Sequence, residues 1–258
     1  MQEIRSQFEN GILTLSLNRP DVFNSFNRTM ALQLQAELDR CATDSAIRVV
    51  VLTGEGKAFC AGQDLAEATD PNGPALQQIV AEHYNPIILK LRHLEKPVIA
   101  AVNGVAAGAG ANIALACDIV VAKESASFIQ AFSKIGLIPD SGGTFMLPRL
   151  VGVQKAMALM LTAEKVSAAD AEKMNMIYKA IADDAFEHYV DQLSAQLAQM
   201  PTTGFGLTKN AVNAALCNTL ENQLALEEQL QTQAGQTHDF KEGVAAFLEK
   251  RKPEFKGN

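Results

Sequence analysis

The sequence has few cysteines and no excess of basic charge. The four cysteines lie far apart, with no C-x-x-C pair and no histidine at ligand spacing. Neither a disulfide framework nor a zinc site is indicated, and we expect no metal site. The formal net charge of −7 gives no positive field that would attract a nucleic acid. We therefore expect no nucleic-acid partner, and buried free thiols at Cys41, Cys60, Cys117 and Cys217.

The sequence also lacks the apolar runs of an exported or membrane protein. Acidic residues occur early in the chain, no signal-peptide run follows, and nothing later approaches the length of a membrane span. We expect a cytoplasmic protein with no membrane partner. What is present is material for a core, because 258 residues with 48% hydrophobic content can fill a large globular domain.

Strands and helices alternate over the first 150 residues. Residues 12–17 alternate in polarity like a half-buried strand, residues 30–41 have helical spacing, and residues 48–53 form a β-branched run typical of a strand covered on both faces. This order favours an α/β fold with a mostly parallel sheet and crossover helices. The alternation continues with a helix at 75–94, a strand at 97–102, a helix at 109–116 and a strand at 118–122.

From about residue 151 the pattern becomes helical. Apolar stripes in this part, such as Leu220, Leu224 and Leu230, need cover from the sheet domain or from another subunit. The expected helices span residues 153–162, 168–174, 183–200, 208–216 and 220–233, with one short strand at 177–181.

Three glycine-containing turns lie beside predicted strand ends, at residues 59–65, 103–112 and 136–144. In an open α/β sheet, ligands bind where loops leave the carboxyl ends of the strands. The second turn runs into an alanine-rich helix whose first amides are unpaired and can bind an oxyanion. Alternatively, Gly108 and Gly110 only permit close packing of the helix on the sheet. A dinucleotide fingerprint is disfavoured because its third glycine is missing.

Asp140 lies in a Pro-Asp-Ser-Gly-Gly turn just before an expected helix at 144–150. It is either an N-cap of that helix or a poised catalytic carboxylate. Ser141 is a poor candidate nucleophile because the G-x-S-x-G elbow is absent. The four histidines lie in helical stretches beside charged residues, which predicts solvated faces for His83, His93, His188 and His238.

Taken in order, these motifs resemble the enoyl-CoA hydratase/isomerase (crotonase-like) family over essentially the whole chain. The matching segments are Asn18-Arg19-Pro20, the Phe-Cys-Ala-Gly-x-Asp-Leu loop at 59–65, residues 96–104, Ala-Cys-Asp-Ile at 116–119, and residues 136–143. The resemblance implies a spiral of repeated ββα units. Residues 1–200 would form the crotonase-like core with the CoA and active sites, and residues 201–258 a helical C-terminal region that builds a homotrimer or hexamer.

The resemblance also implies roles for residues. The substrate would be an acyl-CoA with no separate cofactor, since coenzyme A is part of the substrate. The backbone amides of Gln63 and Ala109 would form an oxyanion hole for the thioester carbonyl. Contacts with substrate or CoA would come from Phe23, Ala61, Asp64, Leu65, Gly110, Asn112, Phe132 and Ile138.

Departures from the family pattern favour isomerisation over hydration. The two glutamates of the hydratases correspond to Asn112 and Phe132. Hydration needs acid and base groups for water and for the α-carbon, so we expect very low hydratase activity. Asp140 occupies a position that is glycine in those hydratases, and an acid there resembles CoA-thioester isomerases and dehalogenases. We expect Asp140 to be the acid/base group.

Within the family, the glycine loops and the segment 131–144 are similar to members that convert 1,2-epoxyphenylacetyl-CoA to oxepin-CoA. A Δ3,Δ2-enoyl-CoA isomerase of fatty-acid oxidation is the alternative. A dehalogenase requires an additional histidine for which the sequence shows no position. A protein that binds a CoA thioester without catalysis is a further alternative.

Overall fold

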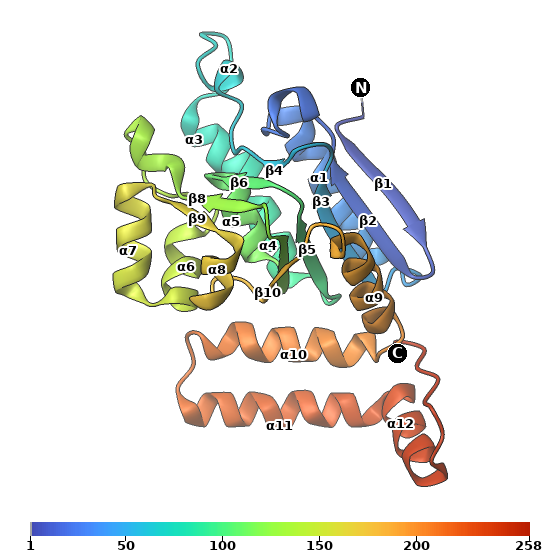
Figure 1. The fold of residues 1–258 in the computed structure, drawn as a ribbon. Coiled ribbons are helices and arrows are strands. Elements are labelled where there is room, and N and C mark those ends of the chain that lie inside the picture. Colours follow the sequence, from blue (N-terminus) through green and yellow to red (C-terminus); the bar gives the residue numbers. More distant parts are fainter. Residues whose placement is uncertain (1) are drawn as a thin grey trace.

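The computed structural model describes residues 2–258 and contains two β-sheets (Figure 1). The larger sheet has the order β1-β2-β3-β5-β7-β10 and is parallel except for the β1–β2 hairpin. The smaller sheet has the order β4-β6-β8-β9. The strands are β1 (Ile4–Glu9), β2 (Ile12–Leu17), β3 (Val49–Gly54), β4 (Ala58–Cys60), β5 (Val98–Val102), β6 (Val105–Ala107), β7 (Ile119–Lys123), β8 (Ser127–Ile129), β9 (Lys165–Ser167) and β10 (Lys179–Ile181).

A repeated unit generates both sheets. In each turn of the chain one strand joins the larger sheet and the next joins the smaller sheet, as in the pairs β3–β4, β5–β6 and β7–β8. Helical segments follow each pair; after β3–β4 and β5–β6 they return the chain to the next parallel strand, and after β7–β8 they lead to β9, which pairs antiparallel with β8. The expected spiral of ββα units is therefore confirmed.

The helical segments cover the sheets and then extend away from them. Figure 1 shows α10 and α11 side by side beyond one end of the body, opposite α2 and α3. The segments are η1 (Pro20–Val22), α1 (Arg28–Thr43), α2 (Leu65–Ala68), α3 (Leu76–Gln78), the π-helical η2 (Ile79–Tyr84), α4 (Asn85–His93), α5 (Ala109–Ala116), η3 (Ala131–Ile135), α6 (Gly143–Val151), α7 (Val153–Thr162), α8 (Ala168–Lys173), α9 (Phe186–Ala198), α10 (Thr202–Ala215), α11 (Leu220–Gln236) and α12 (His238–Glu249).

Most expected helices and strands are present with shifted bounds, whereas β1 and α12 were not expected. The helices at 109–116 and 153–162 have the expected bounds, whereas α10 begins at Thr202 rather than at residue 208. The helix expected at 75–94 is interrupted by the π-helical turn η2. The strands β4, β6, β8 and β9 were not expected, because three residues are too few to show a period.

The central strands are buried on both faces, as their β-branched runs predicted. On β3, Val50 and Leu52 face the main core, while Val49 and Val51 face a second cluster that includes Phe186 of α9. Such two-sided burial is typical of parallel strands flanked by helices. It fixes the sheet between α9 on one side and the site-bearing helices on the other.

The expectation for cysteine is correct at three of four positions. Cys41, Cys60 and Cys117 are buried, and burial raises the pKa of the Cys41 and Cys60 thiols to about 12. The prediction was wrong for Cys217, which is exposed near the end of α10. Across residues 2–258, no helix is both long and apolar enough to cross a bilayer.

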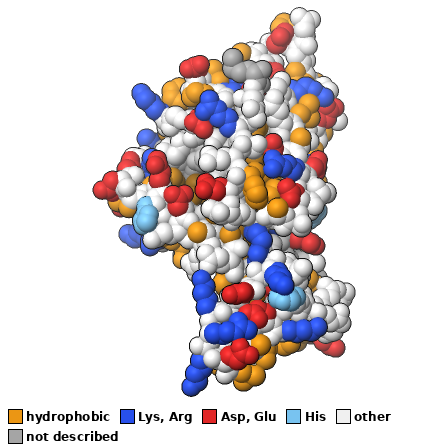
Figure 2. Space-filling model, turned by 90° about the vertical axis from the view of Figure 1, so that its right-hand side faces the viewer, with side chains coloured by type: hydrophobic (Ala, Val, Ile, Leu, Met, Phe, Trp, Pro, Cys, Tyr) orange, Lys and Arg blue, Asp and Glu red, His pale blue; other side chains and the backbone are white. Residues whose placement is uncertain are grey.

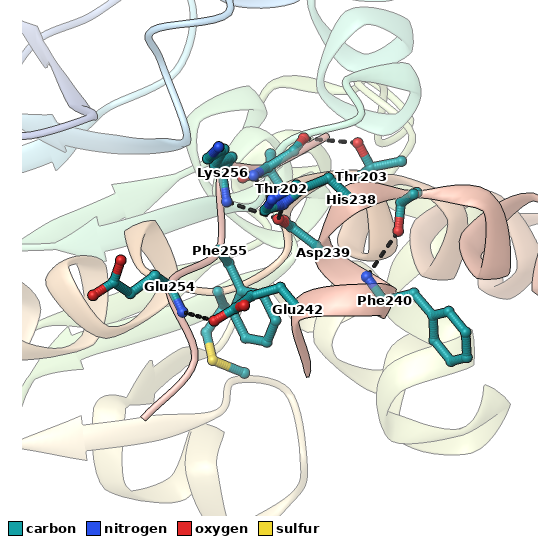
Figure 3. A network of polar contacts seen from close by, with 12 residues as sticks. Thr202, Thr203, His238, Asp239, Phe240, Glu242, Glu254, Phe255 and Lys256 are labelled. Carbon is teal, nitrogen blue, oxygen red and sulfur yellow. Dashed lines mark hydrogen bonds and ion pairs between the residues drawn. The ribbon is translucent and has the colours of Figure 1, made fainter. Parts of the chain in front are cut away.

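The C-terminal tail is fastened to α12 through a buried carboxylate (Figure 3). Asp239 is 2% exposed, and its two oxygens accept the amides of Lys256 and Gly257 at 2.7 Å each. Arg48, which precedes β3, donates to the Phe255 carbonyl at 3.1 Å and to the Thr202 hydroxyl at 2.7 Å. The tail thus joins α12 and the start of α10 to the sheet domain.

We expect Asp239→Ala to reduce the free energy of unfolding by about 2 to 4 kcal/mol, because two backbone amides of the tail lose a buried, charged acceptor. The melting temperature checks this. Glu228→Ala is the control: it removes an exposed carboxylate of α11 and should change stability by less than about 0.5 kcal/mol. Equal stability of the two variants would contradict the proposed tail attachment.

Candidate active site

Two of the glycine loops meet at Gly62. Its φ is +93°, and a Cβ there would lie 3.0 Å from the Ala107 carbonyl oxygen and 3.4 Å from the Ala109 amide nitrogen. Only glycine combines this φ with so close an approach. The loop after β4 is therefore held against the start of α5.

The amides of Gln63 and Ala109 lie on either side of this contact. Ala109 is the first residue of α5, so its N–H has no partner within the helix. Around Gln63, Phe26 pairs with the two neighbours, donating to the Gly62 carbonyl and accepting from the Asp64 amide. Within residues 2–258 neither amide donates to a protein acceptor. These are the donors an oxyanion requires, and the oxyanion hole stays a prediction.

Asp140 is fastened to the same helix. Its backbone carbonyl accepts Nδ2 of Asn112 at 2.8 Å and the amide of Gly143 at 2.8 Å. Asn112 lies one turn along α5 from Ala109. A Cβ on Gly143 would lie 2.3 Å from the Asn112 side-chain nitrogen, so α6 can begin here only with glycine. The helix α5 thus positions both the unpaired amide of Ala109 and the loop that carries Asp140.

The Asp140 carboxyl group is half-buried, and burial raises its pKa. A hydrogen bond of 2.9 Å from the Ser141 hydroxyl to Oδ1 lowers the pKa in part. The alternative interpretation of Asp140 as an N-cap is wrong: the N-cap of α6 is Gly142, and no side chain caps that helix. The carboxylate does not cap α6, and its role as the acid/base group stays a prediction.

Two of the expected substrate contacts, Phe132 and Ile138, differ in burial. Phe132 is 6% exposed, and its ring lies 3.9 Å from where a Cβ on Gly108 would stand, beside the start of α5. Ile138 is 81% exposed and encloses nothing within the protomer. The loop directs this side chain to solvent, and its expected contact with the substrate stays a prediction.

The segments expected to contact CoA lie side by side. The Ala61 amide donates to the Phe23 carbonyl at 2.9 Å, and Arg19 pairs with Oδ2 of Asp64 at 2.8 Å. Phe23 and Leu65 are more than half exposed on this surface, and Ala61 is exposed beside them. Apolar side chains of this kind can receive a flat aromatic ring.

Three of the expected contact residues make contacts within the protein next to the site. Asp64 uses its other oxygen to cap α2 through the Ala66 amide, so both oxygens have protein partners. Gly110 is buried, and a Cβ there would lie 2.5 Å from the Cys60 carbonyl. Asn112 is 1% exposed, and its Oδ1 accepts from Gln130. The contacts of Asp64, Gly110 and Asn112 in the structure hold the neighbouring loops and helices in place.

The sequence did not indicate the buried polar residues of η2. Tyr84 is 1% exposed and donates to Oε1 of Gln63 at 2.8 Å. The prediction of solvated faces was wrong for His83, which is fully buried beside Arg28, and the other three histidines are exposed. A tyrosine in the apolar stripe of a helix was the available signal, since a buried hydroxyl needs a partner.

A groove of about 680 Å³ lies elsewhere, between α9 and the outer face of the larger sheet. No catalytic candidate lines it. In the described part of the chain, residues 2–258, no group of three or more His, Cys, Asp or Glu side chains is arranged to hold a metal ion.

The whole chain is similar to known CoA-thioester enzymes. Residues 7–258 match the enoyl-CoA hydratase/isomerase family. A 1,2-epoxyphenylacetyl-CoA isomerase of Escherichia coli is 50% identical, over 100% of this chain and 99% of that one. A "Probable enoyl-CoA hydratase" of Rhodobacter capsulatus is 47% identical, over 98% of each. The crystal structure of an enoyl-CoA hydratase from Bacillus anthracis superposes with a TM-score of 0.92 at 34% identity, over all of both chains.

The raised pKa of Asp140 predicts a pH-dependent effect on stability. The folded state favours the protonated carboxyl group, so its ionisation opposes folding as the pH rises. We expect Asp140→Asn to melt at or above the wild-type temperature at neutral pH. The difference should disappear in acid, below the pKa of the unfolded chain, where both states are protonated.

Asp183→Asn is the matched control with the opposite sign. Hydrogen bonds from Ser125 lower the pKa of Asp183. Its contribution is present at neutral pH and is lost as the pH falls through the folded-state pKa. A lower melting temperature for Asp140→Asn than for Asp183→Asn at neutral pH would contradict the assigned environment of Asp140.

Proposed function

Because this chain belongs to the enoyl-CoA hydratase/isomerase family, we propose that it converts 1,2-epoxyphenylacetyl-CoA to oxepin-CoA in aerobic phenylacetate catabolism. The family and the isomerase relative support action on an acyl-CoA thioester as an isomerase. The single observation that carries the proposal is Asp140, a half-buried carboxylate with a raised pKa, tied to the helix that begins with the free Ala109 amide.

The amides of Gln63 and Ala109 would hold the thioester carbonyl oxygen. Removing the C2 proton moves charge onto this oxygen, and each amide donor is worth roughly 3 to 4 kcal/mol in comparable sites. Coenzyme A enters as part of the substrate, so no separate cofactor is invoked. Its nucleotide end would lie over the surface formed by Phe23, Ala61 and Leu65.

Asp140 would move the proton. In a double-bond shift it takes the proton from C2 and returns it at C4, so that substrate and product are isomers. With the epoxide, the same oxyanion hole stabilises electron density withdrawn from the ring while the three-membered ring opens and the oxepin forms. A positioned acid/base group contributes about 10²- to 10⁴-fold.

The site lacks the two carboxylates that hydration would use. A hydratase must activate water and protonate the α-carbon, and the two positions where carboxylates would do so are Asn112 and Phe132. Asn112 is moreover buried, with both ends of its amide bonded inside the protein. The presence of hydratase names among the relatives therefore does not transfer that reaction to this chain.

Asp140→Asn should lower kcat for isomerisation by about 10²- to 10⁴-fold, with binding of CoA unchanged, because the amide keeps the size but removes the base. The wild-type rate should fall as the pH falls through the raised pKa of Asp140. An ultraviolet assay with 1,2-epoxyphenylacetyl-CoA and a linear 3-enoyl-CoA checks both.

The substrates decide between the alternatives. Faster turnover of the linear 3-enoyl-CoA favours a Δ3,Δ2-enoyl-CoA isomerase. Binding without turnover of either thioester favours the non-catalytic alternative. Wild-type kcat in folded Asp140→Asn would overturn the mechanism.

We also propose that residues 1–200 form the CoA-binding core and residues 201–258 an oligomerisation region of a cytoplasmic homotrimer or hexamer. The support is the apolar surface of the last helices: Leu220 and Phe247 are 70% and 82% exposed. Figure 2 shows hydrophobic atoms at the lower end of the molecule, where α12 lies. Surfaces of this kind are usually covered by another subunit.

Light scattering at micromolar concentration should therefore give a mass of three or six chains rather than the 27.7 kDa of one. Phe247→Glu combined with Leu248→Glu should shift the mass toward the monomer, because charge replaces the exposed apolar surface of α12. A 27.7 kDa species for the wild type would reject the assembly.

A further inference from the structure

Both ends of the Gln63 side chain are held by the protein. Oε1 accepts the Tyr84 hydroxyl at 2.8 Å, and Nε2 donates to Oε2 of Glu67 at 3.1 Å. The other Glu67 oxygen accepts the backbone amide of Arg28 at 2.9 Å. The side chain is therefore committed to protein contacts, and what Gln63 offers a ligand is its backbone N–H.

The Tyr84 side chain is also fixed by its surroundings. It is 1% exposed, and its ring meets that of Phe26 edge-on, with centroids 5.9 Å apart and planes at 62°. The backbone of Phe26 is the strand-like partner of Gln63, bonded to the residues on both sides of it. Tyr84 thus braces Gln63 twice, through its hydroxyl and through the Phe26 ring.

The backbone of this part of the chain is unusual. Tyr84 ends η2, a π-helical turn between α3 and α4. A π-helical turn interrupts the regular helical hydrogen bonds and is frequent at functional sites. The irregular turn brings the tyrosine hydroxyl to the side-chain oxygen Oε1 of Gln63.

We infer that Tyr84 is a positioning residue that orients the Gln63 backbone amide toward the thioester oxygen. This inference depends on the proposed function, because the amide matters only if it holds a thioester oxyanion. The tyrosine hydroxyl must donate, since an amide oxygen only accepts, and this leaves Nε2 to face Glu67. Burial raises the pKa of Tyr84, with a smaller contribution from nearby acids that include Asp140. The hydroxyl therefore remains a donor throughout the working pH range.

The energetic reason is the strict geometry of an oxyanion hole. A donor acts only when it lies where the charge develops, and misplacement by about 1 Å can cost on the order of 100-fold in rate. Without the Tyr84 hydroxyl, Oε1 of Gln63 loses its buried donor and the loop that carries the amide can shift. Tyr84 has no hydrogen bond to Phe23, Ala61 or Leu65, so substrate binding through the CoA surface should be spared.

The first test is kinetic. Tyr84→Phe keeps the ring against Phe26 and removes only the hydroxyl, so kcat should fall by about 10- to 100-fold with KM within threefold. Gln63→Leu keeps the backbone amide and should cause a similar loss. If Tyr84 acts through the Gln63 side chain, the double variant should be no more than about twofold slower than Gln63→Leu. Multiplying losses would overturn the inference.

The second test needs no turnover. Phenylacetyl-CoA with a ¹³C-labelled carbonyl has no double bond to move, and its carbonyl stretching frequency reports the hydrogen bonds it receives. Wild-type protein should lower this frequency on binding, and Tyr84→Phe should lower it less. No shift in the wild type would defeat the proposed oxyanion hole. A normal shift that is unchanged in Tyr84→Phe would defeat only the role of Tyr84.

Tyr178→Phe is the matched control, because it makes the same substitution at a side chain that is 63% exposed and outside the site. It should leave kcat and the carbonyl frequency unchanged. If Tyr84→Phe does not fold, Gln63→Leu replaces it in both measurements: a reduced shift and a lower kcat support the inference, and wild-type values overturn it.

Discussion

The geometry of this site depends on one partly buried hydrogen bond, from the Asn112 side chain to the Asp140 carbonyl. Asn112 lies on α5, and the helix begins at Ala109, so this bond fixes the distance between the amide that would hold charge and the carboxylate that would move a proton. A buried amide is costly unless all of its groups are paired. Gln130 completes the pairing at Oδ1, and the bond therefore has no competing partner.

Close backbone approaches make that bond possible. Gly62, Gly110 and Gly143 each lie where a Cβ would press on a neighbouring loop or helix, at 3.0 Å or less. This close packing partly buries the polar groups, and charges interact more strongly when they are removed from water. Burial also raises the pKa of Asp140. Packing at glycine and the chemistry of the carboxylate are thus two results of one arrangement.

The helical end of the chain is attached by polar contacts more than by a shared core. Lys209 of α10 pairs with the largely buried Asp118 at 2.7 Å, while Asp239 and Arg48 secure the tail. Hydrogen-bonded charges of this kind set direction, because each fits only one geometry. The apolar faces of α11 and α12 remain outward, and Figure 2 shows charges of both signs interspersed across the adjoining surface.

Much of this protein was determined by local sequence. The repeated strand and helix pattern, the three glycine turns and the acid at position 140 were all readable, because periodicity and backbone freedom are properties of neighbouring residues. Which side chains meet was not readable. His83 and Tyr84 fit the helical pattern equally well as exposed or buried residues, and Asp140 fitted a helix cap. Only the tertiary structure decided among these, because a hydrogen bond between residues 63 and 84, or 112 and 140, depends on distances that the folded sheet sets and the chain order does not record.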